Sequence, residues 1–516
     1  MAKLFVLSLL GLHVTLVASH TCTVPEAKRT DCGYVGINED ECVKKNCCWE
    51  AAQSSDTPWC FFSAEETPAC PLAFKSKGSP FDKGEMETFR SLFLTNIDVN
   101  KSGAVVASPD PDTPGGSYYF DWSRDEALTM MTLFKTSEFT PDIDQTFRRY
   151  SLWVAKVLKD SESPTGVNMR IEVKFNVPEG TAFTGPWCRP QTDAPPLRAQ
   201  ALMLYAEKLI SLGRESEVSD LGLWDDSAPH GGLIKYNLEW IMESWKSEGC
   251  DLWEEVRNKA FFWNSMHFRA ALIRGAAFAR SRGDEGSAER YEKEALQVQA
   301  AIEADHFREE ADGTLWVAEA DNRDKDAAVP LAFATADLED GFLSASSPRV
   351  LGSLAVLSEL FCSTFRINQE DTKNGVPGVM LGRYRGDVYA GGNPWIIGTA
   401  AMAQVMYRAA KELRASAKKV DPAVVSALTR LLSVEARAVS DNRAAATALE
   451  GAADGILLRV RYHAEGLQWH LPEQFDRESG MGKSAKDLTW SFATVLDAMA
   501  ERGEGEEKTQ YFLRFA

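Results

Sequence analysis

Residues 118–125 of this 516-residue chain read YYFDWSRD, and the helix-forming sequence EAL follows at residues 126–128. Four of the eight side chains are aromatic, and Arg124 and Asp125 lie where a helix is expected to begin. A charged pair at a helix start commonly acts as a cap, and that interpretation can coexist with a role in binding. The stretch predicts an aromatic, charged loop that leads into a core helix.

From about residue 71 onward the chain alternates helical blocks and long loops. Apolar side chains recur at three- and four-residue steps within residues 197–208, 396–413, 422–439 and 488–500, which predicts helices. Alternating runs of strand type are scarce, and loops rich in Gly, Pro, Asp and Trp separate the blocks. Such ordered loops are where function usually lies. The pattern favours a mainly α domain, either a helical toroid or a bundle, and periodicity alone does not choose between them.

Composition limits the class of protein and its partners. Hydrophobic residues make up 44% of the chain and charged residues 25%, as in an ordinary globular protein. The formal net charge of −19 argues against nucleic acid and against anionic membrane surfaces as partners. The sequence has no glycine-rich phosphate loop, no clustered histidines and no dinucleotide-binding fingerprint, so we expect neither a cofactor nor a metal.

The first residues indicate secretion. Residues 1–19 combine a basic start, a short apolar run and small residues at the end, which predicts a signal peptide cleaved after Ser19. No later stretch is long and apolar enough to span a bilayer. We therefore expect the protein to be secreted, or to reside in the lumen of the secretory pathway or vacuole. Asn100, followed by Lys and Ser, is a candidate for N-glycosylation.

Six of the ten cysteines lie between Cys22 and Cys60, with the spacing C-x9-C-x9-C-x4-C-C-x11-C. So many cysteines in a short segment indicate a disulfide scaffold, although sequence alone leaves the pairing open. The spacing resembles the trefoil, or P-type, module. The resemblance implies the pairs Cys22–Cys48, Cys32–Cys47 and Cys42–Cys60. We assign residues 20–62 to this module, 63–76 to a linker and 77–510 to the helical domain.

Two tryptophans of the small module, Trp49 and Trp59, allow two interpretations. They could stack on sugar, or they could cover the disulfide core, which is the usual role of aromatics in small scaffolds. The module is therefore a candidate for contact with a carbohydrate or a glycoprotein.

Two acidic segments lie far apart in the chain, DLWEEV at residues 251–256 and LPEQFD at residues 471–476. Apolar neighbours penalise the ionised carboxylate, so a carboxyl group there can stay protonated and act as an acid. A second carboxylate in a wetter setting would stay ionised and act as a base. Paired carboxylates of this kind carry out glycoside hydrolysis. The alternative is a solvated or capping charge pair without catalytic function.

Three further loops complete the pattern: PWCRPQTD at residues 186–193, GRYRGDVYAGGNPW at 382–395 and KDLTWSF at 486–492. Together with the segments already quoted, and in this order, they resemble the glucoamylases, the fifteenth family of glycoside hydrolases. The resemblance runs from about residue 85 to about residue 500. It implies an (α/α)6 barrel with its active site in a pocket at one end.

The resemblance also implies roles for the carboxylates. Glu254 would be the general acid that protonates the leaving group, Glu473 the general base that activates water, and Glu255 a sugar-binding residue. The implied function is that of a secreted, exo-acting, inverting glucan 1,4-α-glucosidase, which releases β-D-glucose from the non-reducing ends of starch- or glycogen-type α-glucans and malto-oligosaccharides. Besides Glu255, the expected substrate-binding residues are Tyr118, Trp122, Arg124, Asp125, Trp187, Arg189, Leu252, Trp253, Arg383, Tyr389 and Trp490.

Two positions depart from the family pattern. Cys188 stands where the family usually has glycine, and Cys250 where it usually has an aromatic residue. Both changes fall beside the expected pocket in a secreted chain, so we predict a disulfide Cys188–Cys250 that braces the loop carrying Glu254. The remaining pair would be Cys70–Cys362, although four cysteines allow two other pairings.

Three rival functions are open to such a chain. One is a secreted carbohydrate- or mucin-binding protein with an inactive hydrolase-like domain, but the retained acid and base argue against it. A second is a related (α/α)6 enzyme such as a trehalase or a disaccharide phosphorylase, against which the ordered loop set argues. A third is a retaining α-glucosidase with a trefoil module, but such enzymes use a β/α barrel, and alternating strands are scarce here.

Overall fold

The structure is a computed structural model that describes residues 22–26, 29, 32–33, 36–45, 47–52, 58–63, 69–225, 227 and 229–503. The expected signal peptide, residues 1–19, lies outside the described residues. The chain divides into two compact units, Met1–Pro68 and Ala69–Ala516. Each unit is described by itself.

The first unit is small and disulfide-rich. Helix α1 (Glu39–Lys44) begins with a capping box in which Asn38 and Glu41 exchange hydrogen bonds, and strands β1 (Cys48–Trp49) and β2 (Cys60–Phe61) pair antiparallel. The disulfides are those implied by the trefoil resemblance, Cys22–Cys48, Cys32–Cys47 and Cys42–Cys60.

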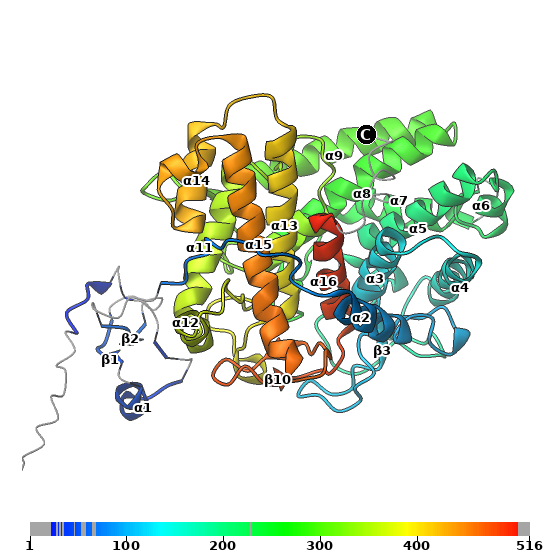
Figure 1. Cartoon of the computed structure of the whole chain (residues 1–516). Helices are drawn as coiled ribbons and strands as arrows, with labels where there is room; N and C mark the ends of the chain where they lie inside the picture. Colours follow the sequence, from blue (N-terminus) through cyan, green and yellow to red (C-terminus); the bar gives the residue numbers. More distant parts are fainter. Residues whose placement is uncertain are drawn as a thin grey trace, which may run out of the picture. The chain divides into compact units, whose positions relative to one another are not determined.

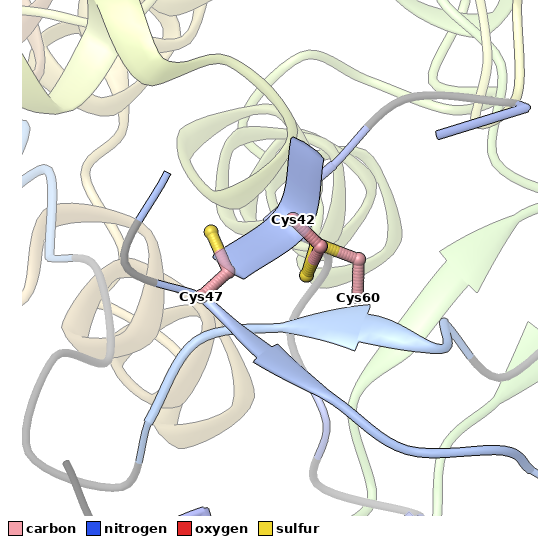
Figure 2. A group of neighbouring side chains, drawn as sticks. All are labelled: Cys42, Cys47 and Cys60. Carbon is pink, nitrogen blue, oxygen red and sulfur yellow. A yellow bond between two sulfur atoms is a disulfide. The ribbon is translucent and has the colours of Figure 1, made fainter. Parts of the chain in front are cut away.

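One group of sulfur atoms in this unit has the spacing of a metal site. The ligand atoms of Cys42, Cys47 and Cys60 lie within 4.8 Å of one another, and in the described part of the chain no other group of His, Cys, Asp or Glu does so. Figure 2 shows the bond that joins Cys42 to Cys60, with Cys47 beside it, and Cys47 is bonded to Cys32. Because the thiolate is the metal ligand, these oxidised sulfurs serve as cross-links instead.

The second unit is built around a ring of six helices that are buried on nearly all sides, as expected for helices that are apolar all round. Each contacts the next, and the last contacts the first, which closes the ring. They are α3 (Ser123–Thr136), α5 (Ala194–Ser211), α8 (Phe262–Ser281), α10 (Ala328–Thr335), α13 (Ile396–Ala415) and α16 (Thr489–Arg502).

Six further helices alternate with these inner helices along the chain and pack against the ring from outside (Figure 1). Helix α4 is typical: Thr140 caps it, Pro141 begins it, and its buried residues Phe147, Tyr150 and Trp153 lie on one face. Alternating inner and outer helices make this unit an (α/α)6 barrel. The outer helices are α2 (Lys83–Thr95), α4 (Pro141–Val157), α7 (Leu233–Ser244), α9 (Glu285–His306), α11 (Pro348–Thr364) and α15 (Asn442–Glu465).

Short elements occupy the connections. The helix expected over residues 422–439 ends early, because Ser433 adopts a left-handed backbone after α14 (Pro422–Leu432), and a 3-10 turn η6 (Ala436–Val439) follows. Four antiparallel strand pairs lie in the loops: β3 (Phe120–Trp122) with β4 (Lys174–Asn176), β5 (Gly249–Cys250) with β6 (Arg257–Asn258), β7 (Phe307–Glu309) with β8 (Leu315–Val317), and β9 (Gln474–Phe475) with β10 (Gly482–Lys483). The other short helices are α6 (Ser216–Asp220), α12 (Arg366–Lys373), η2 (Val99–Lys101), η3 (Met169–Ile171), η4 (Pro229–Gly231) and η5 (Tyr389–Gly391).

The N-terminal ends of all six inner helices meet at one end of the ring. Hydrogen bonds and ring contacts between the loops that precede these helices join each to its neighbour. The joining contacts are Arg124 Nη1 to Asp193 Oδ2 (3.4 Å), Trp263 Nε1 to Asp193 Oδ2 (3.0 Å), Phe262 N to Glu319 O (2.9 Å), Ala327 N to Arg383 O (2.8 Å), Ile396 N to Glu473 O (3.4 Å) and the Arg124 guanidinium over the Trp490 ring (5.7 Å). Helix N-termini carry partial positive charge, so this end of the barrel favours carboxylates.

Two disulfides lie in the second unit, and they are the remaining expected pairs. Cys70–Cys362 ties the segment before α2 to α11, and Cys188–Cys250 joins the loop before α5 to β5. Among the described residues, no single helix has the length and hydropathy to cross a membrane. The bent pair of α11 and α12 meets those criteria together, with a 90° angle between the two helices.

Candidate active site

A cavity of about 230 Å³ opens where the N-terminal ends of the inner helices meet. The loops that precede α3, α5, α8, α13 and α16 supply most of its wall. Thirteen of the expected site residues line it: Tyr118, Trp122, Arg124, Asp125, Trp187, Leu252, Trp253, Glu254, Glu255, Arg383, Tyr389, Glu473 and Trp490. Ala107, Gly115, Trp395 and Leu488 complete the lining.

Glu254 is held at the cavity by three donors. Trp122 Nε1 donates to its Oε1 at 2.9 Å, and Arg124 Nη2 donates to the same atom at 3.0 Å. Trp187 Nε1 donates to Oε2. The side chain is 12% exposed, so it keeps access to the cavity. These donors come from the start of α3 and from the loops before α3 and α5. Together with the loop before α8, which carries Glu254, they determine where this carboxyl group lies.

The backbone of Glu254 is also unusual, because its φ of 65° lies in the left-handed region that non-glycine residues rarely adopt. Asp251 holds the turn: its Oδ1 accepts from the backbone N of Glu255 at 2.7 Å and of Val256 at 2.9 Å. Arg323 Nη1 anchors the other oxygen of Asp251 at 2.6 Å. Backbone strain of about 1–3 kcal/mol persists only where surrounding contacts impose it, and such residues cluster at functional sites.

Glu255, the next residue, points toward different partners. Its oxygens accept from Arg383 Nη2 at 2.7 Å, from Arg323 Nη2 at 2.8 Å and from the Tyr384 hydroxyl. Burial opposes ionisation of Glu255, but the guanidinium of Arg383 and its other donors outweigh that effect and lower its pKa. Glu255 is therefore an ionised carboxylate whose hydrogen bonds join the loops before α8 and α13.

Arg124 and Asp125 form a buried ion pair at the cavity wall. Arg124 Nε lies 3.4 Å from Asp125 Oδ2, and Arg124 Nη1 donates to Gln191 Oε1 at 3.1 Å. Burial raises the pKa of Asp125 to about 7, although Arg124 opposes that shift, and the charge of Glu254 adds to it. A charged pair in the lining gives this wall both donors and acceptors for a polar ligand.

Glu473 lies on the loop between α15 and α16 and is only 2% exposed. Its Oε1 accepts from the Tyr118 hydroxyl at 3.0 Å, and its Oε2 from Gln474 Nε2 at 2.9 Å. Burial raises the pKa of Glu473, while hydrogen bonds from Ser484, Tyr118 and Gln474 oppose that shift. The folded barrel buries Glu473 more deeply than Glu254, so the carboxylate expected to act as the base is not the better solvated of the two.

One charged residue near Glu254 was not anticipated from the sequence. Lys174, on β4, is 1% exposed, and its ammonium lies 3.4 Å from the centre of the Trp187 ring and 4.0 Å from that of Trp122. The rings of Phe120 and Phe183 close the cage. Burial lowers the pKa of Lys174 to about 8, and the charge of Glu254 opposes that shift. Nothing in the local sequence marks this lysine, because its cage forms only when β3 pairs with β4.

Arg189 and Trp395 differ from what the sequence led us to expect. Arg189 does not line the cavity. Its Nε donates to Glu172 Oε1 at 2.7 Å and its Nη1 to the carbonyl of Gly185 at 2.9 Å, so it shapes the loop around Trp187. Trp395 does line the cavity but was not assigned a role, although it ends the loop sequence GNPW. Its ring centre lies 5.3 Å from that of Trp253.

Sequence comparison places this geometry in a known family. Residues 92–500, most of the chain, match the description Glycosyl hydrolases family 15, and residues 22–63 match the Trefoil (P-type) domain. The chain belongs to glycosyl hydrolase family 15. It is a glycoside hydrolase of the glucoamylase type, with a trefoil domain that precedes the family 15 barrel.

Individual relatives agree with this assignment. The hydrolase is 28% identical over 493 residues to the glucoamylase of Blastobotrys adeninivorans, which covers 87% of this chain and 77% of that protein. It is 30% identical over 423 residues to glucoamylase-1 of Schizophyllum commune, covering 78% of this chain and 69% of that protein. The solved family 15 glucoamylase from Hypocrea jecorina superimposes with a TM-score of 0.70 at 29% identity, over 81% of this chain and 71% of that one.

Proposed function

We propose that this hydrolase is a secreted, exo-acting, inverting glucan 1,4-α-glucosidase that releases β-D-glucose from the non-reducing ends of α-glucans. The observation that carries the proposal is that Glu254 and Glu473, from loops far apart in the sequence, line one small cavity in different surroundings. In inverting glycosidases one carboxyl group acts as the acid and the other as the base for a water molecule on the opposite face of the sugar.

Glu254 is assigned as the general acid. It protonates the glycosidic oxygen as the bond to the anomeric carbon breaks. The donors Trp122, Trp187 and Arg124 then stabilise the carboxylate that remains, because hydrogen bonds to a charged group are stronger than neutral ones. The positive N-terminal ends of the inner helices act in the same direction.

Glu473 is assigned as the general base. It removes a proton from the water that attacks the anomeric carbon from the opposite face, so the configuration inverts. Its raised pKa makes it a stronger base than an exposed carboxylate, and the donors Tyr118, Gln474 and Ser484 keep it ionised and oriented. In this scheme a single displacement yields β-glucose, with no covalent intermediate.

The shape and chemistry of the cavity support exo action on a glucan end. Its volume of about 230 Å³ lies below the roughly 300–1,000 Å³ of pockets for drug-sized ligands, which suits one sugar ring better than a chain. The ion pair of Arg124 and Asp125 places a donor group and an acceptor group in the wall beside the hydroxyls of that ring. The apolar faces of Trp122, Trp187 and Trp490 would pack against it.

Secretion and a carbohydrate contact through the trefoil domain complete the proposal. Five disulfides, including the two in the barrel, favour an oxidising compartment. Trp59 of the trefoil domain is 48% exposed and its ring meets that of Trp49 edge to face, 5.9 Å between centres. An exposed indole of this kind can stack on a sugar.

Following the anomer of the released sugar tests the function. The protein is incubated separately with maltose, soluble starch, trehalose and isomaltose, and proton NMR records the glucose signals before mutarotation. We expect β-glucose first from maltose and starch. Initial α-glucose would exclude inversion, hydrolysis of trehalose in preference to maltose would indicate a trehalase, and no glucose from any substrate would favour a binding protein.

A further inference from the structure

A second cavity, of about 410 Å³, lies in the bore of the barrel at the end opposite the catalytic pocket. All six inner helices contribute side chains from their C-terminal halves, such as Lys135 of α3, Glu207 of α5, Arg274 of α8 and Arg408 of α13. Trp490 lines both cavities, so its indole separates them. The proposed hydrolysis assigns no role to this space.

The lining of the second cavity is acidic overall. Four cationic side chains face seven carboxylates, which are Glu207, Glu292, Asp337, Glu339, Asp340, Asp497 and Glu501. The C-terminal ends of the inner helices add partial negative charge at the same place, because their last carbonyl groups lack helical partners. The cavity therefore favours a positively charged occupant.

The carboxylates differ in how well the protein compensates them. Glu501 accepts from Lys411 Nζ at 3.0 Å and Arg408 Nη2 at 3.2 Å; burial opposes its ionisation, but these cations lower its pKa to about 2. Glu207 makes no ion pair or hydrogen bond with any described residue, and burial raises its pKa to about 7 despite the charge of Arg274. Burial also raises the pKa of Asp497. The distance from Asp497 Oδ1 to Lys135 Nζ is 3.6 Å.

A neutral acceptor lies in the same wall. Gln200, about two turns before Glu207 on α5, is fully buried and lines the cavity. Its Nε2 donates to the carbonyl of Pro196 at 3.2 Å, but its Oε1 accepts from no described residue. A buried carbonyl oxygen without a donor leaves one unmatched acceptor in this wall.

The remaining wall is apolar. Leu128, Met203, Leu331 and Ala493 are buried and line the cavity between these polar groups. A ligand that suits the whole lining thus combines hydrogen-bond donors and positive charge at one end with a short hydrocarbon body. Anions and sugar phosphates would be repelled by the uncompensated carboxylates.

We propose that this second cavity is a binding site for a small organic cation, such as a primary alkylammonium ion. The ammonium group binds at Glu207, and the alkyl chain packs on the apolar wall. Because the occupant would also contact Trp490, its binding is expected to perturb the indole that separates it from the catalytic pocket.

Butylammonium chloride is the probe, with 1-butanol as its uncharged counterpart of similar shape. Ligand-observed saturation-transfer NMR and the shift in Tm are measured for the full-length protein. We expect saturable binding and a saturable rise in Tm with butylammonium only. Equal responses to both compounds, or no response to either, would overturn the proposal.

Three variants locate the site. Glu207→Gln and Asp497→Asn remove one charge each while keeping shape, and we expect the affinity for butylammonium to fall about tenfold or more in the first and less in the second. Glu87→Gln, which removes an exposed charge on α2, is the matched control and should bind as the wild type does. Wild-type affinity in Glu207→Gln, an equal loss in Glu87→Gln, or displacement of butylammonium by maltose would each refute the assignment. Circular dichroism confirms that each variant is folded.

Discussion

Removing the disulfide Cys188–Cys250 should change both the stability of the barrel and the geometry of its active site. The double variant Cys188→Ser/Cys250→Ser opens a cross-link with a sequence separation of 62 residues. By the loop-entropy relation, closing a loop of that length stabilises the folded state by about 4 kcal/mol. We expect most of that to appear as a lower midpoint of guanidinium unfolding.

The same variant should also lower kcat, because the disulfide joins the loop of Trp187 to the strand that leads into Glu254. Trp187 donates to Glu254, and a hydrogen bond to a charged group contributes about 1.5–3 kcal/mol. Partial loss of that contact corresponds to a decrease in kcat of about tenfold. The loops stay close, since the backbone N of Cys250 donates to Pro190 O at 2.8 Å, so the site should be loosened and not abolished.

Cys70→Ser/Cys362→Ser is the matched control. Its cross-link has a sequence separation of 292 residues, which predicts a larger stabilisation of about 6 kcal/mol, and neither cysteine lines the catalytic cavity. Both variants are assayed for kcat and KM on maltose at a temperature at which circular dichroism shows them folded. A wild-type kcat in the Cys188 and Cys250 variant, or an equal decrease in kcat in the control, would refute the idea that this disulfide positions Glu254.

Substitutions at three further positions test the roles of side chains around the two carboxylates. Glu473→Gln should lower kcat by about 10²–10⁴ with little change in KM, measured by glucose release, and strong residual activity would remove it as the base. Ser484→Ala removes a hydrogen bond that lowers the pKa of Glu473; because the base must be ionised, the acidic limb of the kcat/KM profile should move to higher pH, and an unmoved limb would contradict this. Lys174→Met removes the cation between Trp122 and Trp187, so we expect kcat to fall about tenfold. Lys174→Arg keeps the cation and should retain more activity. A wild-type kcat in the methionine variant would show that the cation does not support the positions of the two tryptophans. Burial lowers the pKa of Lys174 to about 8, so wild-type kcat should decline above that pH and the arginine variant should not.

Several features of the hydrolase follow from short stretches of sequence. The spacing of the six N-terminal cysteines resembles the trefoil module, and that resemblance implies the pairing, which the spacing alone leaves open. Helical periodicity over residues 197–208, 396–413 and 488–500 predicts most of the inner helices α5, α13 and α16. The ordered loop motifs resemble those of the glucoamylases, and that resemblance implies the barrel. Thirteen of the expected site residues accordingly line one cavity.

Other features depend on contacts between residues far apart in the chain. Glu473 has apolar neighbours such as Leu471 and Phe475, as Glu254 has its own, so local composition does not reveal which is the more buried. The solvation of each is determined by what packs over it: Tyr118 and Gln474 enclose Glu473, whereas Glu254 keeps an exposed edge. Helix α14 likewise ends at Leu432 although apolar residues continue at helical spacing. It ends there because Ser433 adopts a left-handed backbone conformation.

Sequence by itself therefore determined the mainly helical class of the fold and the presence of a cysteine scaffold, because these depend on patterns within single segments. Resemblance to the family implied most of the residues that line the catalytic cavity. Only the tertiary structure decided the surroundings of those residues. The aromatic cage of Lys174, the left-handed turn at Glu254 and the second cavity behind Trp490 each require segments from several loops or helices to meet. The burial of a carboxyl group and the charges around it depend on residues from other parts of the chain. The tertiary structure therefore determines which carboxyl group can act as a base and which cavity can hold a cation.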